Sequence, residues 1–207
     1  ICCSATIANP GEHAERLISL PCEVVDNDGS PHGGKEFVFW NPPVDDPATQ
    51  ARKSTNSEAA MLFSELVSHD IRTLAFTRTR RLAELVYSYA RDRLKSTFPG
   101  RAGRIKPYRA GYMPEVRRQI EKELASGKLM GVVATTALEL GIDIGDLDAT
   151  LIAGYPGTIS STWQQAGRSG RKGQRALTIL IARQDPLDQY LMDHPEAFFG
   201  KRYENAL

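Results

Sequence analysis

Apolar positions alternate between short continuous runs and longer stretches with helical spacing. The short runs predict buried β-strands at 37–40, 72–76, 105–108, 131–135, 149–153 and 176–182. Apolar residues three and four positions apart predict helices at 57–67, 79–96, 114–125, 160–170 and 186–192. Strands that alternate with helices in this way predict an α/β fold, a parallel sheet flanked by helices on both faces.

The first part of the chain has a different pattern. An apolar run at 1–6 and another at 22–25 predict short strands, and Asn9 followed by Pro10 predicts the start of a helix. Turn-forming residues fill 26–34. Because so little structure cannot enclose a core, we expect residues 1–33 to be the end of another domain. Residues 34–207 then form a separate domain, in which we expect 44–53 and 98–106 to be irregular.

Composition excludes several classes of protein. The chain is 41% hydrophobic and 25% charged, which is typical of a globular protein, and it has no apolar run long enough to span a membrane. Three cysteines and four histidines show neither a disulfide framework nor the spacing of a metal site. We therefore expect no metal ligands in the chain, no membrane partner, and an intracellular location, cytoplasmic and nucleoid-associated.

Charge is distributed unevenly, although the net charge is only +1. Between Arg78 and Arg118 there are twelve Lys or Arg residues against three Asp or Glu residues. Such a block is either a solvated face or a local patch that binds phosphates. The sequence leaves both interpretations open.

The stretch from Gln164 to Arg171 has the strongest chemical signal. Arg168 and Arg171 lie three residues apart, each preceded by a glycine, so that in a helix both guanidinium groups would face the same way. A guanidinium keeps its charge and binds phosphate oxygens bidentately, as an arginine finger does in phosphoryl transfer. The alternative is an exposed basic end of a helix.

Three stretches in this order resemble motifs III, V and VI of superfamily 2 helicases. They are Ser-Ala-Thr at 4–6, the run at 134–144, and Gln-Gln-Ala-Gly-Arg-Ser-Gly-Arg at 164–171. The longer run at 138–171 resembles the mitomycin-repair-factor, or RecQ4-like, branch of DEAD/DEAH-type DNA helicases, which carry a C-terminal zinc-binding domain. The resemblance implies a RecA-like second motor domain.

The resemblance also implies roles for residues on the nucleotide side. Arg168 and Arg171 would be catalytic and face the γ-phosphate of ATP. Gly141, Asp143 and Gln164 would complete the ATP-binding set, although Asp143 could instead cap a turn. Ser4 and Thr6 would couple the two motor domains. We interpret Trp163 as core packing, with base stacking as the alternative.

A second set would contact nucleic acid. Thr77, Arg78 and Thr79 resemble motif IV, where two hydroxyls, helix-start N–H groups and one Arg could cradle a phosphate, unless the threonines merely cap a helix. Thr135 and Thr136 match the start of motif V. Arg109 stands where relatives usually have His. Because ligands bind at the carboxyl ends of parallel strands, we expect all candidates, the arginine stretch included, to gather there.

The chain lacks the other half of a nucleotide site. No Gly-x-x-x-x-Gly-Lys-[Ser/Thr] loop occurs, and no Asp-Glu pair follows an upstream apolar strand. The resemblance places both in a first RecA-like domain before Ile1, which would complete the site for ATP and Mg²⁺. We therefore expect this fragment alone to be inactive.

The expected function is that of the C-terminal motor domain of an ATP-dependent DNA helicase. Its partners would be single-stranded or forked DNA and the first RecA-like domain of the same polypeptide. By resemblance it would translocate 3′ to 5′ and unwind duplexes in DNA repair. Two alternatives remain: an RNA helicase or non-unwinding translocase, and a non-enzymatic nucleic-acid-binding module.

Overall fold

The computed structural model describes residues 1–4, 6–27, 29, 33–139, 144–145, 147–170 and 173–206. Its strands are β1 (Lys35–Trp40), β2 (Val44–Asp46), β3 (Ala51–Arg52), β4 (Thr73–Phe76), β5 (Ile105–Tyr108), β6 (Gly131–Ala134), β7 (Ala149–Ala153) and β8 (Ala176–Ile181). Its helices are α1 (Pro10–Ile18), α2 (Thr55–Ser68), α3 (Arg80–Thr97), α4 (Pro114–Ala125), α5 (Ile159–Ala166), α6 (Pro186–Asp193) and α7 (Glu196–Phe199), with 3₁₀ turns η1 (Pro99–Arg104) and η2 (Thr136–Leu138).

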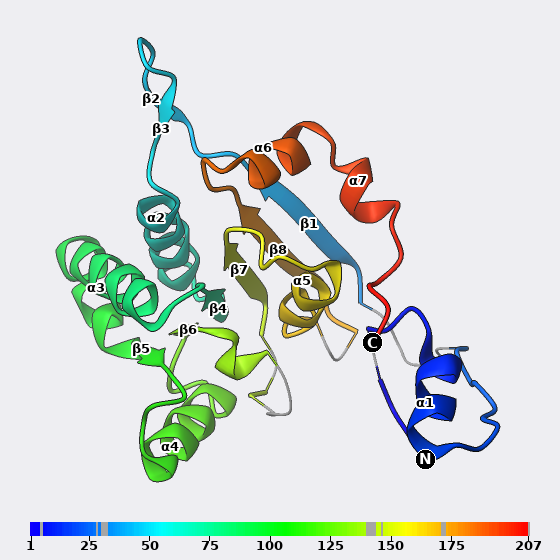
Figure 1. The fold of residues 1–207 in the computed structure, drawn as a ribbon. Helices are drawn as coiled ribbons and strands as arrows, with labels where there is room; N and C mark the ends of the chain where they lie inside the picture. Colours follow the sequence, from blue (N-terminus) through cyan, green and yellow to red (C-terminus); the bar gives the residue numbers. More distant parts are fainter. Residues whose placement is uncertain are drawn as a thin grey trace.

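A six-stranded sheet forms the centre of the molecule, in the order β1-β8-β7-β4-β6-β5 (Figure 1). Every neighbouring pair in this sheet is parallel. Helices α2 and α3 cover one face, while α4 and α5 to α7 pack on the other. The predicted α/β fold, with a parallel sheet flanked on both faces, is confirmed.

Alternating side chains along each strand build the two halves of the core. On β4, Ala75 faces the α2 and α3 side, while Leu74 and Phe76 face α4. On β7, Leu151 belongs to the first side, and Ile152 packs with α5 and α6. Because successive side chains of a strand point to opposite faces, central strands that are apolar throughout bury both faces.

The approach of α2 to the sheet depends on a residue without a side chain. A Cβ built on Gly131, the first residue of β6, would lie 2.4 Å from Phe63 Cζ and 2.9 Å from Val67 Cγ2. Phe63 and Val67 are both fully buried on α2. The glycine therefore lets the helix lie directly over the start of β6.

Some of the predicted strands and loops are wrong. The described residues of 1–6 and 22–25 form no strand. Residues 1–4 are exposed, so solvent can satisfy their backbone groups without a partner strand. The segment 44–53 is not irregular, because β2 and β3 pair as a hairpin that projects from the sheet (Figure 1). Asp46 closes its turn by accepting the N–H of Ala48 at 2.9 Å. Residues 98–106 likewise contain η1 and the start of β5 rather than only a loop.

The N-terminal helix lies apart from the sheet, and both chain ends lie on that side of the molecule (Figure 1). Helix α1 has no buried residue, in agreement with a segment that encloses no core of its own. The division into residues 1–33 and 34–207 stays a prediction. None of the described helices is long and apolar enough to cross a membrane.

Candidate functional site

The carboxyl end of β4 lies beside that of β6. Register pairs Phe76 with Ala134, which brings Thr77 next to the start of the predicted motif V. The N–H of Thr77 donates to the carbonyl of Ala134 at 2.8 Å, and its hydroxyl lies 3.3 Å from the same oxygen. Thr77 is only 4% exposed. This side chain therefore joins two strands, while Thr135 and Thr136 follow β6 at the surface of the same edge.

The second threonine of this stretch has a local role. Thr79 is the N-cap of α3, and its Oγ1 accepts the N–H of Leu82 at 3.2 Å. This is the capping interpretation that the sequence left open, and it is confirmed. The Arg78 side chain between the two threonines is exposed, so the charge of this loop faces solvent.

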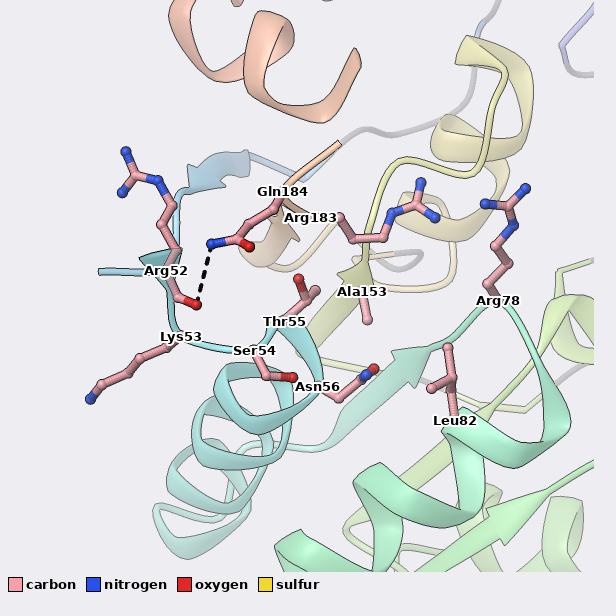
Figure 2. A pocket seen from close by; sticks show the side chains of 10 residues that line it. All are labelled: Arg52, Lys53, Ser54, Thr55, Asn56, Arg78, Leu82, Ala153, Arg183 and Gln184. Atoms are coloured by element: carbon pink, nitrogen blue, oxygen red, sulfur yellow. Dashed lines mark hydrogen bonds between the residues drawn. The ribbon is translucent and has the colours of Figure 1, made fainter. Parts of the chain in front are cut away.

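Arg78 lines a cavity of about 230 Å³ beyond the carboxyl ends of β4, β7 and β8 (Figure 2). The residues that line it include Arg52, Lys53, Arg78 and Arg183, and no carboxylate is among the described ones. The side chains of Arg52 and Lys53 point away from the cavity in Figure 2, and Arg52 Nη1 donates to the carbonyl of Pro42 at 2.9 Å, so Arg78 and Arg183 supply its positive charge. Ser54, Thr55 and Asn56, at the start of α2, form another part of its wall. Helix N-termini and guanidinium groups both favour anions, so the cavity suits a phosphate group.

One cation of this wall is held rigidly. Arg183 donates to the carbonyl of Tyr155 at 2.9 Å and pairs with Asp188 at 3.3 Å. Asp188 is 1% exposed and also accepts the N–H groups of Tyr155 and Arg183. Burial, with Glu204 and Asp188 nearby, raises the pKa of Tyr155 to about 12. The network fixes the loop after β7 against the loop after β8.

Arg52, Lys53 and Arg183 line the cavity but were not predicted as site residues. Arg52 and Lys53 lie in the segment expected to be irregular, where the end of the hairpin leads into the start of α2. Two basic residues directly before Ser54 and Thr55 at a helix start were the available signal. Arg183 follows the last strand, and only the strand order places it beside Arg78.

Arg109 has partners within its own neighbourhood. Its guanidinium lies 4.7 Å from the ring centroid of Tyr112 and 3.4 Å from Glu84 Oε1. Burial and the charge of Glu84 raise the pKa of Tyr112. Arg109 is 41% exposed, so a direct contact with nucleic acid stays a prediction.

The basic block between Arg78 and Arg118 is not one continuous patch. Arg101 and Arg104 both pair with Asp70 at the end of α2, and Arg101 Nη2 lies 2.7 Å from Asp70 Oδ2. Arg78 instead faces the cavity. Much of the block is therefore a solvated, ion-paired face, and phosphate binding at Arg78 stays a prediction.

The predicted nucleotide side lies on α5. Gln164 Nε2 donates to Thr6 Oγ1 at 2.5 Å, and Ser160 Oγ donates to the Thr6 carbonyl at 2.9 Å. The predicted motif VI and the end of the predicted motif III are therefore in contact. Ser4 is exposed and makes no hydrogen bond among the described residues.

Arg168 lies just past the end of α5, so the helical stretch expected at 160–170 is too long. The helix ends at Ala166, and Gly167 begins a turn. Arg168 is 5% exposed, and its Nε donates to the carbonyl of Glu139 at 3.0 Å. The Glu139 carboxylate accepts from Ser161 Oγ and Gln165 Nε2, each at 2.8 Å. Glu139, which sequence reasoning gave no role, thus joins the predicted motifs V and VI.

The expectation that all candidates gather at the carboxyl ends of the strands is wrong. Gly170 donates to the carbonyl of Leu147, which precedes β7, and Lys35 at the start of β1 donates to the carbonyl of Ala166. Helix α5 runs back along β7, so its last residues return to the amino ends. Arg168 and Arg78 therefore lie at opposite ends of the sheet.

The remaining assignments of the sequence analysis have different outcomes. Trp163 stacks on Phe198, with ring centroids 5.6 Å apart, in a cluster with Phe37 and Phe199, so its interpretation as core packing is confirmed. Gly141, Asp143 and Arg171 lie outside the described residues. No group of three metal-ligating side chains occurs in the part of the chain that the structure describes.

Comparison with known proteins decides the family. The family described as "Helicase conserved C-terminal domain" matches residues 58–173, more than half of the chain. The chain belongs to this helicase family. The match includes the carboxyl-edge stretch at Arg78, the Glu139 junction and Arg168, so the geometry described above is that of a helicase C-terminal domain.

Individual relatives agree with this family. The "Uncharacterized ATP-dependent helicase YprA" of Bacillus subtilis is 43% identical over 206 residues, which cover 100% of this chain and 27% of that protein. The "ATP-dependent helicase hrq1" of Schizosaccharomyces pombe is 40% identical over 94% of this chain and 19% of its own length. A solved structure titled "Crystal Structure of DUF1998 helicase MrfA bound to DNA and AMPPNP" matches with 43% identity and a TM-score of 0.92, over 100% of this chain and 28% of that one. The chain thus spans between about a fifth and just over a quarter of the length of these relatives.

Proposed function

We propose that this chain is the second motor domain of an ATP-dependent DNA helicase. The observation that carries the proposal is the placement of two chemically different sites at opposite ends of one sheet. A basic cavity with Arg78 lies at the carboxyl edge, and Arg168 lies near the amino edge, just after the helix whose Gln164 contacts Thr6 of the predicted motif III. A domain built in this way can hold a strand at one end and respond to a nucleotide at the other.

The carboxyl edge would hold the backbone of one DNA strand. Arg78 is exposed at the cavity, and Arg183 is fixed in its wall. Cations bind a strand through its phosphates and carry no sequence information, which suits an enzyme that moves along DNA. DNA as substrate is supported by likeness to a solved helicase described as bound to DNA. Movement from 3′ to 5′ and a role in repair are part of the proposal and rest on the motif resemblance alone.

The amino-edge site would supply half of an ATP site. Guanidinium and amide N–H groups of this kind bind phosphate oxygens. In this structure Arg168 donates from Nε and Nη2 to the carbonyl of Glu139, and Gln164, on the last full turn of α5, donates to Thr6, so both would exchange these partners for the triphosphate. ATP supplies a phosphoryl group whose hydrolysis drives the motor. Arg168, with Arg171, would stabilise charge on that group, and Glu139 would hold Arg168 in place beforehand. The first motor domain would bring the Mg²⁺ ligands.

ATP turnover by the full-length protein tests this proposal. Wild type and Arg168→Ala are compared with single-stranded DNA, with RNA, and without nucleic acid. We expect stimulation by DNA and a loss of about 10³-fold in turnover for the variant, as for other arginine fingers. Single-strand affinity should be unchanged, because Arg168 lies at the opposite end of the sheet from the basic cavity.

Two further variants separate catalysis from folding. Arg168→Lys keeps the charge but loses the fork, so its turnover should also fall strongly. Arg118→Ala removes an exposed arginine of α4 and should be neutral. Normal turnover in both Arg168 variants would overturn the assignment, and stimulation by RNA alone would move the enzyme to the other substrate class.

A further inference from the structure

Two distant segments of the chain meet at the start of α5. Residues 6–9 and 203–206 lie beside the first turn of this helix, and we call these two segments together with 158–160 the terminal clasp. Their separation in sequence approaches the length of the chain, so only tertiary structure joins them. Figure 1 shows both ends of the chain on this side of the molecule.

Glu204 is the residue that contacts α5. Its Oε1 accepts the N–H of Ile159 at 2.6 Å, and its Oε2 accepts the N–H of Ser160 at 2.9 Å. Thr158 Oγ1 accepts the N–H of Ser161 at 3.0 Å. The N–H groups that a helix start leaves without intrahelical partners are thus satisfied, two of them by one carboxylate from a remote segment.

The charge of Glu204 suits this position. Burial raises the pKa of its carboxyl group, but hydrogen bonds from the N–H groups of Ser160 and Ile159 outweigh burial, so the pKa lies below its usual value. The side chain is therefore ionised at neutral pH. A negative charge at the positive end of a helix stabilises that end.

The same short segment also holds the chain that leads into the domain. The N–H of Ala8 donates to the Glu204 carbonyl at 3.3 Å. Asn9 and Ala206 form a reciprocal pair, in which the Ala206 N–H donates to Asn9 Oδ1 at 2.8 Å and Asn9 Nδ2 donates to the Ala206 carbonyl at 3.2 Å. Asn9 makes no side-chain cap on α1, because its amide is used here.

Helix α5 connects the clasp to Arg168. The helix has eight residues, so it is about 12 Å long and behaves as one rigid unit. Its start is held by Glu204 and Thr6, and Arg168 follows its last turn. Because misplacement of a catalytic group by about 1 Å can cost on the order of 10²-fold in rate, the anchor at the start of α5 bears on the placement of Arg168.

We propose that Glu204 is a positioning residue for ATP hydrolysis, which acts through α5 on Arg168 and ties the segment entering the domain to that helix. This inference rests on the proposed function of Arg168. It assigns a role in turnover to residues 203–206, which hold the start of α5 and are not among the residues that line the basic cavity. Among the described residues, the hydrogen bonds of the Glu204 carboxylate go to backbone N–H groups of the clasp.

The test is a double-mutant cycle in the full-length protein. Glu204→Ala should lower the DNA-stimulated kcat about tenfold with little change in the KM for ATP or in single-strand affinity. Glu204→Gln keeps one acceptor for the helix N–H groups, so its kcat should lie between those of the alanine variant and wild type. Combined with Arg168→Ala, the Glu204→Ala change should have no further effect, because both act on one group.

Controls separate this proposal from the function on which it rests. Glu196→Ala removes an exposed carboxylate of α7 and should leave kcat unchanged. Suppose that Arg168→Ala lowers kcat. If Glu204→Ala is neutral, or if it lowers the kcat of the Arg168→Ala variant by the same factor as that of wild type, the positioning role is wrong while the proposed function stands. If Arg168→Ala is neutral, the proposed function itself fails. A Glu204→Ala protein that unfolds is replaced in the cycle by Glu204→Gln.

Discussion

Glu123 on α4 illustrates how single residues stabilise this domain outside the candidate site. Its carboxylate accepts from Lys106 at 2.6 Å, from Gln119 at 2.9 Å and from Lys128 at 3.5 Å. The hydrogen bond from Lys106, together with that from Gln119, lowers the pKa of Glu123 to about 2. The carboxylate thereby joins α4 to β5 and to the loop before β6.

This pKa shift predicts a pH dependence of stability. The pKa in the folded state lies below the unfolded value of 4.5, so the contribution is complete above pH 4.5 and is lost as pH falls towards 2. Because both lysines are partly exposed, we expect Glu123→Gln to cost only about 1–2 kcal/mol at pH 7. Urea denaturation at pH 7 and pH 3 would measure the free energy of unfolding of both proteins. The difference in this free energy between wild type and variant should be smaller at pH 3 than at pH 7. Glu36→Gln, at an exposed position of β1, is the control.

At the scale of elements, α2 packs closely on the sheet because Gly131, at the start of β6, has no side chain. A Cβ atom at position 131 would lie so close to Phe63 and Val67 that buried atoms would have to shift. Both partners are fully buried, so neither can move into solvent. The position of α2 also sets the position of Ser54 and Thr55 at the basic cavity.

Gly131→Ala should therefore destabilise the domain. Overpacking of a buried contact costs typically about 1–3 kcal/mol, and we expect a value in this range from chemical denaturation. Gly103→Ala is the matched control, because a Cβ on Gly103 meets no atom within 4 Å and should be neutral. Equal stabilities of the two variants would mean that α2 adjusts freely over the sheet.

At the scale of the whole molecule, the sheet separates the two sites. The basic cavity is formed by residues from the hairpin region, the start of α2 and the loops after β4 and β8. Arg168 instead follows the C-terminal end of α5. Contacts with a strand and contacts with a nucleotide should therefore be separable by mutation. Their coupling would depend on rigid elements that run between the edges, such as α5.

Removal of the cavity cations should weaken strand binding and spare nucleotide binding. We expect Arg78→Gln in the full-length protein to lower single-stranded DNA affinity and to reduce the slope of log K against log salt by about 0.7. Fluorescence anisotropy over a salt series would measure both. Arg118→Gln should leave the slope unchanged, and an unchanged slope in the Arg78 variant would place the strand elsewhere.

The sequence alone determined the motifs of this protein and the strands and main helices of its large sheet, but not the β2–β3 hairpin. Strand and helix identity depend on apolar spacing within a few residues, so β1 and the helices α2 to α4 could be predicted from local pattern. The arginine stretch at 164–171 and Thr79 as a cap are local signals of the same kind. Trp163 in the core also follows from its place on an amphipathic helix.

Only the tertiary structure decided which of these residues meet. Strand order brings Arg183 beside Arg78, and the return of α5 along β7 takes Arg168 away from both. Glu139 and Glu204 carry no signal in the sequence, because each acts by accepting hydrogen bonds from residues distant in the chain. Local periodicity in the sequence predicts a helix or strand, but it does not predict which other elements pack against it. The basic cavity and the surroundings of Arg168 are both built from residues that are distant in the sequence, so only the tertiary structure defines them.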